Sequence, residues 1–293
     1  EIVDTVLAAP ETHVVVLTNG TLLAKRIGEL QRWGSERFHV QISIDGLPPR
    51  HDAVRGEGAF DALATRLNGL RQHEFPFTIS MCVDADNVAD MPGLVEQAAE
   101  LGASNVHFMW LFVRGRALPD RFAPPDLIFT HLRKAAATAR RLDIELDNLD
   151  AFKTQVFAPP GTIHDGSTTA WEAAALGPDD RLHPSAALIG VPELATAVPT
   201  SLREAWRESP VLDRIRQSSA AELKDPLRYL IGGGDSDHCY NHGGQFVGTD
   251  PYEPLYENIV LDLIASAAGD VGEEAPRLRL KMGDILESCG AHG

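Results

Sequence analysis

The sequence predicts an α/β fold with a parallel sheet, and two features of its first half support this prediction. Short apolar runs rich in β-branched residues alternate with amphipathic stretches of helical spacing. This alternation is typical of βαβ units, whose strands run parallel. The runs are almost continuously apolar, as expected for strands that helices cover. Four to five units are too few for a closed eight-stranded barrel, so a partial barrel and an open doubly wound sheet both fit.

Each predicted element begins or ends at a local signal. The run HVVVL is followed by the turn residues Thr18-Asn19-Gly20, and the run HVQISI by Asp45-Gly46. A helical stretch that starts at Met91 ends at Gly102. In chain order we predict a strand at 13–17, a helix at 22–33, a strand at 39–44, a helix at 60–70, a strand at 77–83, a helix at 91–101, a strand at 106–113, a helix at 125–142 and a short edge strand at 143–146.

The composition changes near Asn148, which predicts a second domain. The following residues are rich in Ala, Pro, Ser and Asp, with one helix predicted at 202–217 and another at 254–268. The run Gly232-Gly233-Gly234 predicts a flexible break between them. We therefore expect a barrel domain at 1–147, an extension at 148–268 and a polar tail at 269–293.

Charge and cysteine content exclude several classes of protein. The net charge of -16 argues against nonspecific binding to nucleic acid or anionic membranes. No apolar run is long enough for a transmembrane helix. The three cysteines, Cys82, Cys239 and Cys289, are too widely spaced to predict a disulfide framework. We therefore expect a cytoplasmic protein without nucleic-acid or membrane partners.

Polar side chains follow the predicted strands where each one ends. In parallel α/β sheets, ligands bind beyond the carboxyl ends of the strands, so these residues should share one mouth. Hydroxyl, carboxylate and guanidinium groups suit a polar ligand with hydroxyls and both signs of charge; the same residue types also cap helices and form turns. The residues are Asn19, Ser43, Asp45, Asp84, Asp86, Asn87 and Arg114.

Four segments stand at characteristic separations in the first 120 or so residues. TNGTLL follows an apolar strand, QISIDG precedes HDAVRGEGAFD, and FTISMCVDADNV and VHFMWLFVRGRA fit the next two strands. Together they resemble the middle of radical S-adenosylmethionine (radical SAM) enzymes of the SPASM type. The resemblance implies a partial (β/α)6 barrel, in which the four strands here correspond to strands three to six.

The resemblance also implies cofactors. In that family a 4Fe–4S cluster, held by three cysteines of a CxxxCxxC loop, binds S-adenosylmethionine (AdoMet). Cleavage of AdoMet then yields a 5′-deoxyadenosyl radical that takes a hydrogen atom from the substrate. We thus expect AdoMet, a 4Fe–4S cluster and an electron donor such as flavodoxin or ferredoxin. The cofactor would carry the reaction, and the protein would orient it.

Several residues match cofactor-binding positions of the family. Ser43 and Asp45 would lie near the AdoMet ribose or carboxylate, and a carboxylate suits a vicinal diol because it accepts two hydrogen bonds. Arg55, in HDAVRG, would pair with the methionine carboxylate; a surface salt bridge is the alternative. Asn19 would shape the turn below the cofactor, and Asn87 is a further candidate.

The last predicted strand supplies the remaining candidates. By the same resemblance, Leu111 and Val113 would flank the adenine. His107 and Trp110 are candidates for the substrate cavity, and for Trp110 the alternative is core packing.

The chain departs from the family at the cluster loop, because no CxxxCxxC occurs in it. It also opens without an initiator methionine. We expect the cluster ligands upstream of Glu1, in residues missing from this chain. A processed natural N-terminus and a degenerate, inactive relative are the alternatives.

A second departure concerns the C-terminal half. AWEAAALGPDDRLHPSAALIGVPEL, SLREAWRESPVLDRIRQ and GGGDSDHCYNHGGQF resemble the SPASM extension, with a small hairpin, a helix and a final loop. The family usually has several cysteines there, whereas this chain has Ser185 at one common cysteine position and keeps Cys239 alone in the last loop. We therefore expect no intact auxiliary cluster.

His238, Cys239 and His242 form an HCxxH motif in that last loop. Imidazole and thiolate groups at this spacing suit Zn²⁺ or Fe, but a complete site needs more ligands. The motif predicts either a metal site or a glycine-rich structural or substrate-binding loop.

Three functions follow in order. The first is a radical SAM enzyme that modifies a peptide or protein substrate. The second is a noncatalytic relative that binds a peptide or an AdoMet-like nucleotide. The third is a metal-dependent hydrolase that uses His238, Cys239 and His242.

Overall fold

The computed structural model describes residues 1–159, 167–198 and 200–269. It divides into two units, the first over Glu1–Asp150 and the second beginning at Ala151, and each unit is described by itself. Among the described residues, no helix is long and apolar enough to cross a membrane. Residues 270–293 of the predicted tail, with Cys289, lie outside the described residues.

Five parallel strands in sequential order form the sheet of the first unit. Neighbouring strands pair in register, for example Val14 with Phe38 and Thr78 with Asn105. The prediction of a parallel sheet is confirmed. The strands are β1 (Val14–Thr18), β2 (Phe38–Ser43), β3 (Phe77–Val83), β4 (Asn105–Trp110) and β5 (Glu145–Leu146).

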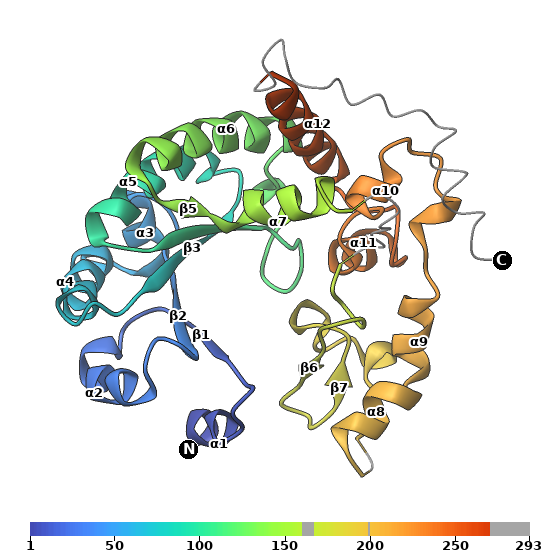
Figure 1. Cartoon of the computed structure of the whole chain (residues 1–293), viewed down its shortest axis with the longest axis horizontal. Coiled ribbons are helices and arrows are strands. Elements are labelled where there is room, and N and C mark those ends of the chain that lie inside the picture. The colour runs from blue at the N-terminus through green and yellow to red at the C-terminus, as the bar shows by residue number, and fades with distance from the viewer. Residues whose placement is uncertain (160–166, 199, 270–293) are drawn as a thin grey trace. The chain divides into compact units, whose positions relative to one another are not determined.

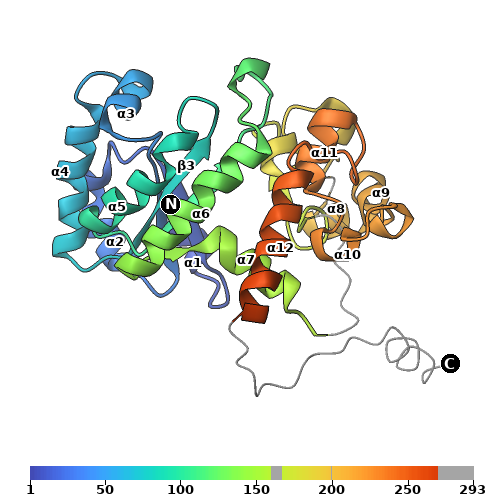
Figure 2. The same ribbon diagram turned by 90° about the horizontal axis from the view of Figure 1, so that it is seen from above.

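Helices connect successive strands, as the amphipathic stretches predict. They pack in sequence against one another, and Figures 1 and 2 show α4, α5 and α6 side by side. The helices α4, α5 and α6 each bury an apolar stripe, for example Leu63, Leu67 and Leu70 on α4. The helices are α1 (Ile2–Leu7), α2 (Leu23–Trp33), α3 (Pro48–Arg55), α4 (Ala59–Gln72), α5 (Met91–Leu101) and α6 (Pro125–Leu142), and α7 (Asp147–Val156) begins at the end of the unit.

Side chains alternate between the two faces of this sheet. One face is apolar and buried under the helices. The other is named here the polar face, because β2, β3 and β4 present His39, Gln41, Ser43, Thr78, Ser80, Cys82, Asn105 and His107 on it. The strand β1 pairs only with β2 in the described sheet, and its polar-face residues Val15 and Leu17 are 54% and 61% exposed.

The strand predicted at 106–113 is shorter than expected. Its last paired residue is Trp110, opposite Val83 at the end of β3. Because no partner strand continues past Val83, the ladder ends there. Leu111 and Val113 therefore lie in the segment after β4 rather than on it.

The second unit combines a small hairpin with short helices around an apolar core. The antiparallel strands β6 (Ala175–Leu176) and β7 (Leu182–His183) form the hairpin. The core includes Leu188, Leu212 and Phe246, with Tyr240 stacked on Phe246 at 4.9 Å between ring centroids. The longer helices are α8 (Leu202–Glu208), α9 (Pro210–Arg216), α10 (Arg228–Ile231), α11 (Ser236–Gly243) and α12 (Glu253–Gly269).

The single helix predicted at 202–217 is wrong, because the structure contains two helices there. Pro210 has no amide hydrogen, so it cannot continue α8 and instead begins α9. Ser209 caps the new helix, with its Oγ accepting the Leu212 amide at 3.2 Å. Pro210 is a signal that one helix ends and another begins. The prediction gave more weight to the continuous apolar pattern than to this proline.

The loop predicted around the HCxxH motif is also a helix. Asp235 caps α11 by accepting the amides of Asp237 at 2.9 Å and His238 at 3.1 Å. The preceding Gly233 and Gly234 have φ of 72° and 92°, a region that glycine enters without strain. At Gly234 an added Cβ would lie 2.4 Å from the Cβ of Asp250, so the glycine run forms a tightly packed turn.

Candidate functional site

The carboxyl ends of β1, β2 and β3 meet at one edge of the sheet, as parallel pairing requires. Ser43 pairs with Ser80, and Thr18 with Ile42, so Asn19, Asp45 and the Asp84–Asn87 turn follow strands that end side by side. This edge, with Asn19, Ser43, Asp45, Asp84, Asp86 and Asn87, is named here the rim. Arg114 lies four residues after β4 in an irregular segment.

Asp45 is held from both sides of its main chain at the rim. Its amide donates to Nδ1 of His51 at 3.2 Å, and its carbonyl accepts Nδ2 of Asn87 at 3.2 Å. Both partners are 3% exposed. Two buried side chains from different elements thus fix the main chain of Asp45, from which its carboxylate extends.

The carboxylate of Asp45 pairs with Arg55 in bidentate geometry. Nε of Arg55 lies 2.5 Å from Oδ2, and Nη2 lies 3.1 Å from Oδ1. This pairing raises the pKa of Arg55, against the opposing effect of its partial burial. The side chains stay 19% and 34% exposed, so the pair still offers carboxylate lone pairs and guanidinium N–H groups to a ligand.

The HDAVRG segment builds the loop that carries this pair. Asp52 accepts the amides of Gly58 at 2.9 Å and Phe60 at 2.8 Å, which ties α3 to the start of α4. These bonds, the Phe60 amide first, lower the pKa of Asp52. His51 accepts the Asp45 amide, and Arg55 binds the Asp45 carboxylate. The motif thus works as one structural unit with the preceding SIDG residues.

The side chain of Asn87 forms all of its hydrogen bonds with main-chain groups. Besides the Asp45 carbonyl, Nδ2 donates to the Cys82 carbonyl at 2.8 Å, and Oδ1 accepts the Asp84 amide at 2.8 Å. Asp90 extends the connection by accepting the Leu47 amide at 3.1 Å. These contacts join the loops after β2 and β3, so Asn87 acts on the site through Asp45.

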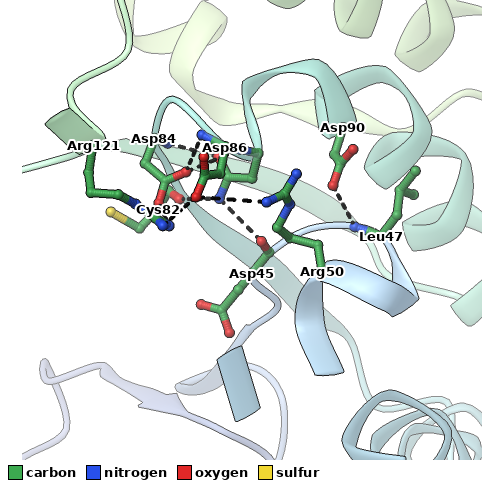
Figure 3. A network of polar contacts seen from close by, with 9 residues as sticks. Asp45, Leu47, Arg50, Cys82, Asp84, Asp86, Asp90 and Arg121 are labelled. Carbon is green, nitrogen blue, oxygen red and sulfur yellow. Dashed lines mark hydrogen bonds and ion pairs between the residues drawn. The ribbon is translucent and has the colours of Figure 1, made fainter. Parts of the chain in front are cut away.

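Carboxylates and arginines continue the network beyond Asn87 (Figure 3). Arg121 binds Asp84 at 2.5 Å and also pairs with Asp86, and Arg50 lies 3.8 Å from Asp86. In Figure 3 the Asp45 carboxylate points away from this network. The network therefore fixes the rim and leaves the Asp45 carboxylate directed elsewhere.

The other predicted residues lie at the rim with different exposure. Asn19 is exposed, and its Oδ1 accepts the amide and hydroxyl of Thr21 at 3.1 and 2.9 Å, so it shapes the turn after β1. Ser43 is half-buried on the polar face. Leu111 is half-buried and Val113 is 39% exposed in the segment after β4.

The polar face carries two histidine pairs that continue from the rim. Nε2 of His39 lies 2.6 Å from the Thr78 hydroxyl, and burial lowers the pKa of His39. Nδ1 of His107 lies 2.8 Å from Asp147. Between them, the buried Oγ of Ser80 has no hydrogen-bond partner. The face therefore has unmet hydrogen-bonding capacity next to Ser43, whereas Trp110 is buried on the opposite face.

The donor set of the rim fits AdoMet but not an iron–sulfur cluster. The Asp45–Arg55 pair matches a ligand with hydroxyls and both signs of charge. A 4Fe–4S cluster needs cysteine thiolates, and the described residues hold only Cys82 and Cys239, in different units. Burial, Asp84 and Asp45 raise the pKa of Cys82 to about 11, which disfavours a thiolate there.

The HCxxH residues of α11 do not converge. His238 and Cys239 are buried and His242 is exposed. His238 packs edge-on against Tyr252, with 4.9 Å between ring centroids, and burial lowers its pKa to about 3. Among the described residues no group of His, Cys, Asp or Glu is arranged to hold a metal ion. The hydrolase hypothesis therefore has no ligand set in this part of the chain.

Sequence reasoning missed several contributors to these networks, among them His51, Arg121 and Asp147. His51 belongs to the HDAVRG segment, and its position between Asp45 and Arg55 in the sequence was a signal that could have pointed to it. Arg121 and Asp147 lie 37 and 40 residues from their partners Asp84 and His107. No local pattern connects residues at such separations.

Relatives in sequence exist, although no protein-family model matches the chain. An AdoMet-dependent heme synthase of Methanosarcina barkeri is 38% identical over 118 residues, which cover 39% of this chain and 33% of that protein. The antilisterial bacteriocin subtilosin biosynthesis protein AlbA of Bacillus subtilis is 27% identical over 180 residues, 59% of this chain and 38% of AlbA. The chain thus spans about a third of the first relative's length and 38% of the second's.

Solved structures share the fold at low sequence identity. The native protein anSMEcpe with bound AdoMet matches with a TM-score of 0.68 and 13% identity, over 88% of this chain and 75% of that one. Streptococcus suis SuiB bound to S-adenosylmethionine matches with a TM-score of 0.58 and 14% identity, over 78% and 56% of the two chains. These neighbours confirm the partial-barrel fold.

The sequence relatives and the structural neighbours agree on one group of proteins. AlbA and the B. subtilis sporulation killing factor maturation protein SkfB, 35% identical over 94 residues that cover 31% of this chain and 22% of SkfB, are SPASM-type radical SAM maturases. The predicted resemblance is confirmed: this chain is similar in sequence to SPASM-type radical SAM maturases, and it shares the fold of its radical SAM structural neighbours.

Proposed function

We propose that this chain is the AdoMet-binding part of a radical SAM enzyme that modifies a peptide substrate. The observation that supports it best is the Asp45–Arg55 pair, fixed at the rim through His51 and Asn87. It presents both signs of charge on a fold that anSMEcpe and SuiB share with bound AdoMet.

In this proposal the rim residues bind and orient the cofactor. Asp45 accepts hydrogen bonds from the ribose hydroxyls, and the free N–H groups of Arg55 face the methionine carboxylate. Ser43 lies beside them on the polar face, and Leu111 and Val113 flank the adenine from the segment after β4. Asn19 and Asn87 hold the turns. When held by these residues, AdoMet would supply the radical chemistry of the reaction.

The substrate class follows from the relatives. AlbA acts in subtilosin biosynthesis and SkfB in maturation of a sporulation killing factor, and one anSMEcpe structure contains the Kp18Cys peptide. We therefore propose a peptide substrate. We also propose a cytoplasmic location and a flavodoxin or ferredoxin as electron donor, since the reaction consumes one electron from outside the protein.

Binding of AdoMet tests the proposal. Anaerobically reconstituted full-length protein should bind AdoMet in calorimetry and form 5′-deoxyadenosine with dithionite. Asp45→Ala should weaken AdoMet binding by about tenfold or more, because a charge-assisted hydrogen bond contributes roughly 1.5–3 kcal/mol. Asp61→Ala, an exposed carboxylate in the first turn of α4, is the matched control. Full-length protein that neither binds nor cleaves AdoMet overturns the proposal.

A noncatalytic binding protein is the second candidate. It is favoured by one observation: the described residues supply no set of cluster ligands. The encoding gene discriminates the two candidates, because a CxxxCxxC upstream of Glu1 supports the enzyme, and an in-frame stop in its place supports the binding protein.

A further inference from the structure

We propose that His51 is a positioning residue of the AdoMet site, and that it holds Asp45 in place only as a neutral imidazole with a free Nδ1 lone pair. The inference rests on the proposed function, since the site it positions is the one proposed for AdoMet. It adds a residue, His51, that acts on AdoMet only through the main chain of Asp45.

The geometry determines which form of the ring is present. The Asp45 amide can only donate, so Nδ1, at 3.2 Å, must accept and the ring proton must sit on Nε2. His51 is 3% exposed, and the Phe60 ring meets it edge-on with 5.9 Å between centroids. The ring therefore has one orientation and one tautomer in which the Asp45 amide is satisfied.

Protonation would reverse this arrangement. A proton on Nδ1 would face the Asp45 amide hydrogen, donor against donor. An acceptor close to Nδ1 is Oδ2 of Asp45, at 3.6 Å, which is the same oxygen that Nε of Arg55 binds at 2.5 Å. Protonated His51 would therefore exchange a main-chain contact for a side-chain contact and compete with Arg55.

The charged groups around His51 act in both directions. Burial is the largest effect and lowers the pKa of His51, and Arg55 lowers it further, whereas Asp45 and Asp52 raise it. The ring is accordingly neutral near pH 7. Its protonation at lower pH displaces Asp45, so AdoMet affinity should fall with falling pH.

Two substitutions separate the Nδ1 acceptor from the ring. His51→Asn places its Oδ1 close to the position of Nδ1 and should keep AdoMet affinity within about threefold of the native protein. His51→Phe keeps the ring but leaves the buried Asp45 amide without an acceptor, and should weaken AdoMet binding by about tenfold or more. His131→Phe on α6 is the matched control and should leave AdoMet affinity unchanged.

The measurement is calorimetric titration of AdoMet into the anaerobically reconstituted full-length holoenzyme, from pH 7.5 to pH 5.5, with thermal unfolding recorded in parallel. Affinity of the native protein should decline on acidification more steeply than that of His51→Asn. If His51→Phe does not fold, this comparison of pH profiles still decides the question.

Different failures have different meanings. Native affinity in His51→Phe, or identical pH profiles for the native protein and His51→Asn, overturns the positioning role and leaves the proposed function intact. Absence of AdoMet binding by the native holoenzyme overturns both.

Discussion

The two units of the molecule use polar side chains in opposite ways. At the rim of the first unit, Asp45 and Arg55 pair at partly exposed positions, 19% and 34%, above buried side chains that hold the main chain. In the second unit, carboxylates bind backbone amides: the half-buried Asp235 caps α11, and the buried Asp250 accepts the amides of Asp235 at 2.7 Å and Tyr252 at 2.8 Å.

This difference separates a binding site from a framework. Backbone amides satisfy these carboxylates of the second unit, so little capacity is left for a ligand, and burial raises the pKa of Asp250 to about 7 and that of Asp237 to about 6. The rim instead keeps unused lone pairs and N–H groups next to solvent. Changes in the second unit should therefore alter stability, and changes at the rim should alter binding.

The largest expected effect is the acid sensitivity that His238 confers on the second unit. Its folded pKa of about 3 lies below the ordinary value of 6.5, so below pH 6.5 the unfolded chain takes up a proton that the folded chain does not. The free energy of unfolding should thus fall by about 2 kcal/mol from pH 6.5 to pH 5 relative to His238→Phe.

Denaturant titrations at several pH values measure this difference. Asp237 and Asp250 act in the opposite direction, because their raised pKa values stabilise the fold as pH falls, so only the difference between native protein and variant isolates His238. His242→Phe, at an exposed position of the same helix, is the control. Equal slopes for the native protein and His238→Phe would contradict the framework role.

A direct comparison of two carboxylates gives the next effect in size. Asp235→Ala removes the side-chain cap of α11 and should lower the free energy of unfolding by about 2 kcal/mol. Asp45→Ala removes a partly exposed ion pair and should lower it by about 1 kcal/mol or less. Urea denaturation of both variants checks this order, and a larger loss for Asp45→Ala would remove the distinction between the units.

Thiol reactivity gives a further contrast. Cys82 is half-buried on the polar face of β3, whereas Cys239 is fully buried in α11, where burial raises its pKa to about 12. Iodoacetamide at pH 8 should label Cys82 at least about tenfold faster than Cys239, which reacts only when the second unit opens. Peptide mass spectrometry resolves the two sites from Cys289. Similar rates at both sites would show that α11 opens readily.

The smallest effect concerns Glu257 on α12. Its hydrogen bond with Asp225 and its burial raise its pKa to about 7, so this raised pKa stabilises the fold at low pH and the benefit is lost as pH rises through 7. Glu257→Gln should raise the thermal midpoint at pH 8 but not at pH 5. The gain at pH 8 should correspond to less than about 1 kcal/mol in the free energy of unfolding. Glu222→Gln, at an exposed position, should do neither. A gain at pH 5 equal to that at pH 8 would exclude the carboxylate pair as its cause.

The sequence by itself determined the strands, their parallel order and the edge at which their polar ends gather. Local signals suffice for this, because period, turn residues and chain order restrict how βαβ units pack. Hence β3 and α5 match their predicted bounds, and Asn19, Ser43 and Asp45 follow strands that end together.

Only the tertiary structure decided which side chains meet at that edge. Arg55 binds Asp45, and Arg121 and Asn87 fix the turn after β3, because register and helix packing bring separate segments within hydrogen-bonding distance. The same holds for α11, where the Asp235 cap starts a helix within a glycine-rich sequence. Hydrogen bonds depend on tenths of an ångström, and no pattern along the chain encodes distances between its folded parts.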